Sequence, residues 1–185
     1  DYANYDLYTI ATKKMSSMTW AGRASIGAAK LQESDAAPLG YSHLNGDYAL
    51  RVTAHEFGHN FGLYHANYSY TLAENPLNRV AYPSAPENSP TQEYGHRYNM
   101  MGSSGATTAF HFSAREKQLL DWLPIEDSPL VLQSGIFRLY RHDHREASSQ
   151  IRSLRIPGGD ATRSYFWLSY RAHPYPQTYA NNFST

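Results

Sequence analysis

The chain has 185 residues, and its 16 Lys and Arg balance its 16 Asp and Glu, so the formal net charge is zero when histidine is neutral. This balance gives no electrostatic basis for binding nucleic acid or an anionic membrane surface. The absence of cysteine excludes disulfides, thiolate metal sites and a cysteine nucleophile, which leaves His, Asp and Glu to hold any metal ion.

The length fits one domain, or one domain with a small appendage. No apolar run approaches the roughly 18–20 residues of a membrane-spanning helix. The sequence starts at Asp1 without an initiator methionine or signal peptide, so we expect an excised or processed piece. Abundant tyrosine and polar connections are typical of extracellular enzymes, and we expect a secreted monomer.

Two strands are predicted near the start of the chain. Residues 5–10 are rich in β-forming side chains, and residues 20–27 form a second candidate whose small residues would let another chain approach its backbone closely. Residues 28–46 show an irregular pattern with two turn signals, so no strand is expected there.

A helix is predicted from about Asp47 to Asn60, with Asn45 or Asp47 as its cap. Gly62 should end it, because glycine tolerates the left-handed conformation that ends helices. The apolar stripe that we expect to face the core consists of Leu50, Ala54, Phe57 and Phe61.

The remaining chain is predicted to contain a long loop, a helix and a β module. Residues 67–99 hold four prolines and predict a loop with at most short turns, of a length that is usually functional or disordered. A helix follows from Ser113 to about Trp122, because Ser113 and Glu116 form a capping box and Pro124 closes the segment. Four runs of β-forming residues then predict an antiparallel β module: 130–133, 136–141, 150–156 and 165–171.

The strongest chemical signal is the stretch His-Glu-Phe-Gly-His-Asn-Phe-Gly-Leu-Tyr-His at residues 55–65. Residues four apart share one face of a helix, so His55 and His59 can bind one metal ion. Gly62 allows a sharp turn that brings in His65 as the third ligand. Three imidazoles leave one coordination position open, as catalytic zinc sites do, and Glu56 can reach a water bound there.

This extended spacing resembles the HExxHxxGxxH motif of the metzincin clan of zinc peptidases. The clan also has a Met-turn beneath the metal-binding imidazoles. Residues 98–102 read Tyr-Asn-Met-Met-Gly, and we assign Met101 to that turn because Gly102 follows it, with Met100 as the alternative. The thioether would form an apolar floor of the metal site.

Within the clan, the wording of residues 59–66, 93–95 and 101–102 looks most like the gametolysin-type secreted peptidases. The resemblance covers about residues 18–123. It implies an α+β fold: a metzincin-like catalytic domain over residues 1–124, with a mixed upper sheet and the zinc helix in 1–62 and an irregular lower half with a C-terminal helix in 63–124. The antiparallel β module would occupy 125–185. Only 54 residues precede His55, so the upper half is either reduced or lacks its beginning.

The expected function is hydrolysis of peptide bonds in an extended protein or peptide substrate. Zinc would lower the pKa of its bound water, and Glu56 would act as general base. Tyr98, His96 and Tyr94 are candidates for a helper that stabilises the oxyanion. By resemblance, the strand near residues 21–26 would pair with the substrate backbone. Calcium is compatible with this fold, but no motif locates a site for it.

Two other functions fit the same motif. The chain could be a catalytically inert metzincin-like binding module, although Glu56 and all three histidines are present. It could also be a zinc hydrolase specialised for glycopeptides. Separately, His142-Asp143-His144 suggests a second metal site, but we favour a solvated turn because charged residues surround it.

Overall fold

The computed structural model describes residues 5–27, 40–69, 91–96, 98–103, 111–143, 150–158 and 165–171. The contacts divide the chain into two compact units. The first consists of Asp1–Asn67 and Glu93–Phe110, and the second of Tyr68–Gln92 and His111–Thr185. These units are defined by contacts within the chain, and they do not test the boundary that we expect between the catalytic domain and the β module after residue 124. That boundary stays a prediction.

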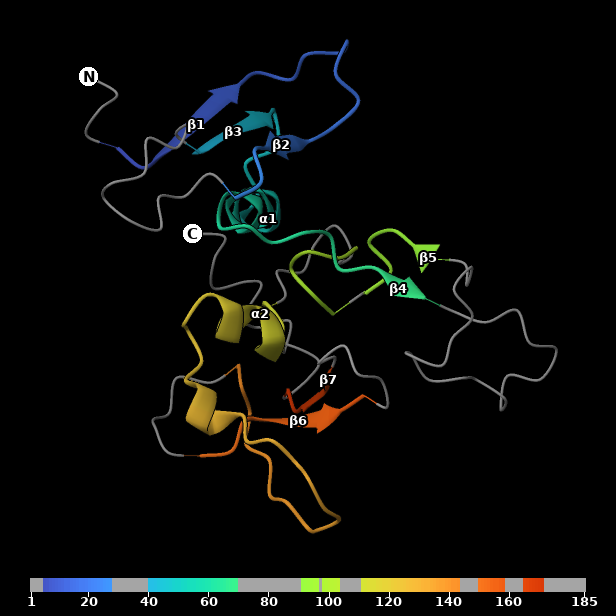
Figure 1. Ribbon diagram of the computed structural model, residues 1–185. Helices are drawn as coiled ribbons and strands as arrows, with labels where there is room; N and C mark the ends of the chain where they lie inside the picture. The colour runs from blue at the N-terminus through green and yellow to red at the C-terminus, as the bar shows by residue number, and fades with distance from the viewer. Residues whose placement is uncertain are drawn as a thin grey trace, which may run out of the picture. The chain divides into compact units, whose positions relative to one another are not determined.

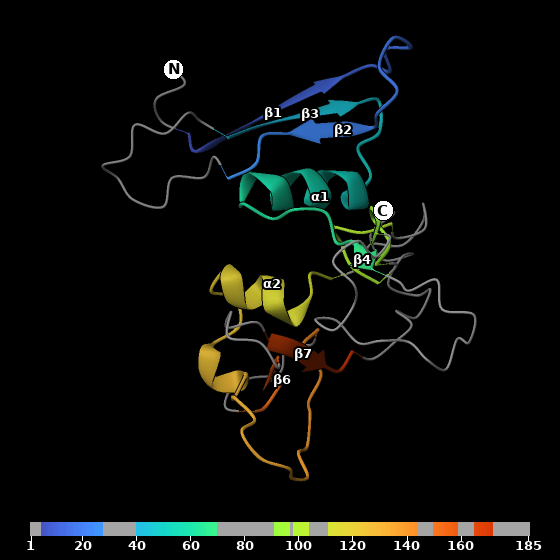
Figure 2. The same cartoon turned by 45° about the vertical axis from the view of Figure 1, so that its right-hand side comes forward.

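The first unit is a three-stranded mixed sheet on one helix (Figures 1 and 2). Strands β1 (Leu7–Thr12), β3 (Gly40–Asn45) and β2 (Gly22–Ala24) lie in that order. β1 runs parallel to β3 and β2 antiparallel to it. Helix α1 (Leu50–Asn60) packs against β2 and β3. The mixed sheet and helix confirm the α+β arrangement predicted for the start of the chain.

Central strand β3 lies in the segment that we predicted to be irregular, and that prediction was wrong. Its sequence hides the strand because its buried positions include the polar Ser42 and Asn45, where a strand pattern would place apolar residues. Pairing on both edges stabilises β3, so tertiary context decides its conformation and local propensity does not.

Asn45 holds the connection between β1 and β2, and it does not cap helix α1. Its fully buried amide nitrogen Nδ2 donates to the carbonyls of Met18 and Trp20, and Oδ1 accepts from the Met15 amide. Asp47 is not the cap either. Helix α1 begins after Ala49 without a side-chain cap. Asp47 Oδ1 accepts a hydrogen bond from the Ala49 amide, just before the first residue of the helix.

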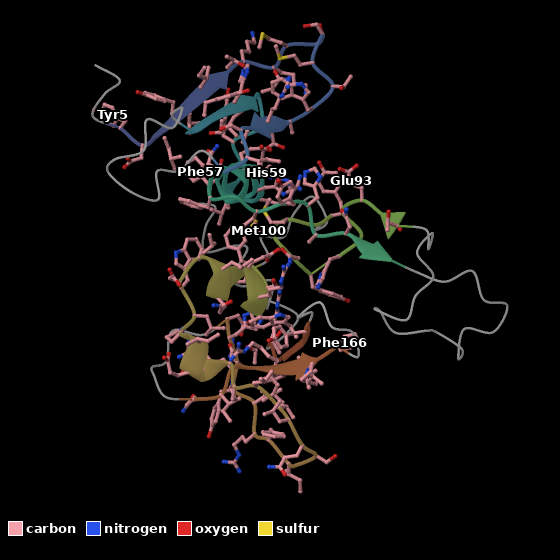
Figure 3. The ribbon with its side chains drawn as sticks, viewed as in Figure 1. Tyr5, Phe57, His59, Glu93, Met100 and Phe166 are labelled. Atoms are coloured by element: carbon pink, nitrogen blue, oxygen red, sulfur yellow. The ribbon has the colours of Figure 1, made fainter. Side chains whose placement is uncertain are left out.

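The buried side of helix α1 differs from the predicted apolar stripe. Leu50 and Phe61 are 48% and 38% exposed, and Ala54 and Phe57 are only half-buried. Figure 3 shows Phe57 and His59 on different sides of the helix. The stripe prediction assumed that apolar residues mark the inside. The buried positions here are mostly polar: Val52, His55, Glu56, Gly58, His59 and Asn60.

The end of helix α1 is fastened to the sheet through its backbone and one side chain. Asn60 Nδ2 donates to the carbonyls of Ser25 and Tyr41, each at 3.0 Å. The Gly27 amide donates to the His59 carbonyl at 2.9 Å. Gly62 has a φ of +92°, as expected of the glycine that ends the helix.

The second unit contains one short helix, a 3-10 turn and two pairs of strands. The capping box of Ser113 and Glu116 is confirmed, since each side chain bonds the other residue's backbone. The elements are β4 (Tyr68–Ser69) paired with β5 (Thr91–Gln92), α2 (Ala114–Leu119), η3 (Ile125–Asp127), and β6 (Ser153–Pro157) paired with β7 (Tyr165–Ser169).

The antiparallel pairing of β6 and β7 confirms the last two strands predicted for the β module. The strands predicted at 130–133 and 136–141 were wrong, because these segments make only isolated bridges from Leu130 to Arg155 and from Arg141 to Tyr170. Most of the loop predicted at 67–99 lies outside the described residues. Within the described part of the chain, no helix has both the length and the apolar character to cross a membrane.

His142 lies in a buried polar network of the second unit. Its Nε2 accepts a hydrogen bond from Arg171 Nε at 3.0 Å, and the Lys117 ammonium donates to its backbone carbonyl at 2.5 Å. Burial, followed by the nearby charges of Lys117 and Arg171, lowers the pKa of His142 from 6.5 to about 3. The ring is therefore neutral in the folded unit at ordinary pH.

Replacing Asn45 with alanine should destabilise the first unit by about 2–4 kcal/mol, because backbone groups of the β1–β2 connection lose their buried partner. Urea unfolding followed by circular dichroism measures this change. The exposed Ser17→Ala in the same connection is the control and should stay within about 0.5 kcal/mol of the parent protein. An equally small effect of Asn45→Ala would contradict the assigned role.

The second unit should lose stability in acid. The folded state binds fewer protons at His142 than the unfolded chain, so this contribution is complete above pH 6.5 and is lost as the pH falls towards 3. The loss should reach about 2 kcal/mol by pH 5. His142→Gln should make the free energy of unfolding of the second unit less dependent on pH between about 6.5 and 5. A parallel slope in the His142 variant would count against this explanation.

Candidate metal centre

Three histidines of the first unit converge on one point. Helix α1 supplies His55 and His59 from adjacent turns of one face, and the segment after Gly62 supplies His65. Their ligand atoms all lie within 4.8 Å of one another. The Nε2 atoms of His59 and His65 are 3.1 Å apart. The structure therefore brings together the three residues that the spacing predicted.

Each imidazole is held by a hydrogen bond at its other ring nitrogen. His55 Nδ1 donates to the Met100 carbonyl at 2.8 Å, and His59 Nδ1 donates to the Leu63 carbonyl at 2.7 Å. His65 Nδ1 donates to Glu93 Oε1 at 2.6 Å. An imidazole whose Nδ1 donates a proton presents the lone pair of Nε2, which is how metal-binding histidines are usually oriented.

These residues fit a zinc ion. Tetrahedral ligands at zinc–nitrogen distances of 2.0–2.1 Å lie about 3.3–3.4 Å apart, close to the separation between His59 and His65. Three histidines leave a fourth position for water or substrate, which distinguishes catalytic from structural zinc sites. The donor set contains no thiolate, because the chain has no cysteine.

The electrostatics of the site keep two ligands uncharged. The pKa of His55 is lowered to about 4, chiefly by burial; the hydrogen bond to the Met100 carbonyl opposes this shift, and the charges of the other two imidazoles and Arg51 add to it. Burial also lowers the pKa of His59. Because only a neutral imidazole can bind a metal ion, this environment removes the competition from protons.

Glu56 is buried on the same helix and lies against strand β2. Burial raises the pKa of its carboxyl to about 7. Its side chain lies so close to Gly22 that a Cβ atom there would approach Glu56 Cγ to 2.7 Å and Cδ to 2.8 Å. We predicted that small residues in this strand admit another chain, and the neighbour found at Gly22 is the Glu56 side chain.

The predicted Met-turn is a tight turn whose backbone contacts the metal-binding segment. Met101 is fully buried and Met100 nearly so. The Gly102 amide closes the turn on the Asn99 carbonyl, and Asn99 Oδ1 accepts from the Met101 amide. The Ala66 amide bonds the Met101 carbonyl, next to His65. Figure 3 labels His59, Met100 and Glu93 in this region.

Of the three helper candidates, Tyr94 has a ring that lies on the metal-binding imidazoles. Its centroid is 3.8 Å from that of His65 and 5.8 Å from that of His55. Tyr94 also has a φ of +57°, an uncommon conformation for a residue other than glycine, and such strain is often found at functional sites. By contrast, Tyr98 is 61% exposed, and the His96 ring accepts a hydrogen bond from the Tyr98 amide.

Sequence reasoning missed the groups that orient the histidines. Glu93 lies 28 positions after His65, and no helical or strand spacing connects them. The carbonyls of Met100 and Leu63 are invisible to a search for side chains. Only the placement of Glu93 within Glu93-Tyr94-Gly95, which contributed to the family resemblance, drew attention to that segment.

The His142 region does not resemble a second metal site. Arg171 already occupies His142 Nε2, and within the described ranges only the group of His55, His59 and His65 has metal-ligand geometry. The turn that we favoured is present at His142 and Asp143, but it is not solvated, because His142 and the side chain of Asp143 are buried. His144 lies outside the described residues.

Comparison with known proteins gives one match. Residues 1–66 match the family described as Metallo-peptidase family M12B Reprolysin-like. No curated protein and no solved structure matches the chain. The matched part contains Gly22, Glu56 and the three histidines, and it ends before Glu93. The first 66 residues are therefore similar to a reprolysin-like metallopeptidase domain, and their histidine triad is of the kind that binds zinc.

Proposed function

We propose that the chain is a zinc-dependent endopeptidase that cleaves extended segments of protein substrates. The observation that carries this proposal is the convergence of three histidines whose Nδ1 atoms are all bonded to oxygen, beside a buried glutamate. Such a site offers three nitrogen ligands and a base at one point. The finer likeness to gametolysin-type peptidases and the secreted location stay proposals of the same kind.

Bound zinc would supply Lewis-acid chemistry, polarising the scissile carbonyl and making water more acidic. His55, His59 and His65 would hold the ion, and their hydrogen bonds to oxygen would keep each ring in place. Glu56 would accept a proton from the attacking water and donate it to the nitrogen of the breaking C–N bond. The products are then a free carboxyl group and a free amine, so the atoms of one water molecule are accounted for.

Tyr94 is the residue that we assign to the oxyanion. Its ring lies on His65, and burial, followed by the carboxylates of Glu93 and Glu56, raises the pKa of its phenol. A phenol that keeps its proton can donate a hydrogen bond to the charge that develops on the substrate oxygen.

Strand β2 is the surface that we assign to the substrate. Among the described residues it pairs only with β3, so it forms an edge of the sheet. An extended peptide can add to such an edge through main-chain hydrogen bonds. Because Gly22 of this strand touches the Glu56 side chain, a peptide bound along β2 would pass directly by the general base.

Glu56→Gln should retain zinc and lose roughly 10²- to 10⁴-fold in kcat, because an amide cannot act as the base. The measurements are zinc stoichiometry and cleavage of an unfolded protein, with a zinc chelator abolishing the parent activity. Exposed Glu126→Gln is the matched control and should behave as the parent. A parent protein that binds zinc without cleaving any substrate would favour the inert binding module.

Gly22→Ala should lower kcat without lowering zinc content. The new methyl group would collide with the Glu56 side chain and force it to move, while the three histidines keep their oxygen partners. The exposed Lys13→Ala, which lies outside β2, is the control and should leave kcat close to that of the parent. Equal kcat for the parent and Gly22→Ala would show that the base tolerates displacement.

A further inference from the structure

The three metal-binding histidines differ in what holds them. His55 and His59 are buried and donate to backbone carbonyls, one of which, Leu63, is only four residues away. His65 is on an irregular segment, its side chain is 22% exposed, and its Nδ1 partner is a carboxylate. The third ligand therefore has the least support from the helix and the only charged partner among the three.

We propose that Glu93 is a positioning residue that fixes His65 for metal binding. The proposal rests on the zinc site proposed above. The 2.6 Å bond from His65 Nδ1 to Glu93 Oε1 places the proton on Nδ1 and leaves the Nε2 lone pair for the ion. A carboxylate partner also makes the imidazole a stronger donor to the metal, as in other carboxylate–histidine–zinc arrangements.

The backbone around Glu93 explains how a partly exposed carboxylate can position a ligand. An isolated exposed pair contributes little, because two mobile side chains must be ordered to form it. Here the next amide, that of Tyr94, donates to Asn67 Oδ1 at 3.0 Å, and the Tyr94 carbonyl accepts from the Ser103 amide at 2.7 Å. These two bonds hold the backbone of Tyr94, the residue next to Glu93, so the Glu93 side chain extends from a fixed backbone.

Tyr94 constrains the same imidazole from another direction. Its ring lies against the face of His65, while Glu93 bonds the edge of the ring at Nδ1. Two consecutive residues thus restrain the His65 ring in different ways. Tyr94 limits tilting of the ring plane, and Glu93 limits rotation of the ring within that plane. The Glu93–Tyr94 pair thereby links the orientation of the third ligand to the position of the residue assigned to the oxyanion.

The experiment compares Glu93→Ala and Glu93→Gln with the parent protein and with the exposed Glu126→Gln as control. Zinc affinity is measured by competition with a chelator. Glu93→Ala should bind zinc about 10- to 100-fold more weakly, as expected for loss of an outer-shell partner. Glu93→Gln should fall between alanine and the parent, because its amide oxygen can accept the bond without the charge. Glu126→Gln should match the parent.

Two further readouts separate positioning from a structural role. NMR of the histidine ring nitrogens should show the His65 proton on Nδ1 in the parent protein. In Glu93→Ala, the chemical shift that marks the hydrogen bond of this proton should be lost. Thermal unfolding in the presence of chelator should be unchanged, because the Glu93 side chain is 66% exposed. A variant that melts earlier without metal and keeps the parent's tautomer would overturn the positioning role.

The outcomes also distinguish this proposal from the proposed function. An active parent with unchanged zinc affinity in Glu93→Ala would overturn the role of Glu93 and leave the peptidase intact. A parent that binds no zinc would overturn both. Weaker zinc binding in Glu93→Ala, graded through Glu93→Gln and absent in the control, would support the role of Glu93, and substrate cleavage by the parent would support the peptidase.

Discussion

A histidine that donates a hydrogen bond from Nδ1 can offer only Nε2 to a metal ion, and this restriction organises the first unit. Three imidazoles must satisfy it at one point, so three oxygen atoms must surround them. The chain provides these from Leu63, which follows helix α1, from the turn at Met100 and from Glu93. The metal centre is thus built by two segments that lie far apart in the sequence.

The sheet supports this site by holding helix α1 at its last turn and by packing against Glu56. Asn60 and the Gly27 amide join the last turn of the helix to the β2–β3 edge, while Gly22 admits the Glu56 side chain. Polar residues therefore occupy the helix side that a simple globular helix would fill with apolar ones. The cost of burying them is met by hydrogen bonds and, when zinc is bound, by coordination.

The metal ligands could be read from the sequence because they are local. His55, Glu56, His59 and His65 span eleven positions, and helical geometry with one glycine determines their relation. Strand β3 and the buried side of α1 were misjudged, because their buried residues are polar and their stability comes from partners elsewhere. The capping box at Ser113 was correct, since both of its bonds lie within four residues. Local chemistry was thus predictable, whereas Glu93 and the Met100 carbonyl depend on a long return of the chain.

That return has a consequence for the order in which the site can form. A growing polypeptide that has been synthesised only to residue 66 contains all three histidines and the Leu63 carbonyl, but neither Met100 nor Glu93. Two of its three imidazoles would be free to rotate and to change tautomer. The segment with Glu93 and Met100 must return to these imidazoles before all three are fixed. Closing that loop has an entropic cost that grows slowly with the length of the loop. Competence to hold the ion should therefore appear late in folding, well after the helix that carries most of the motif.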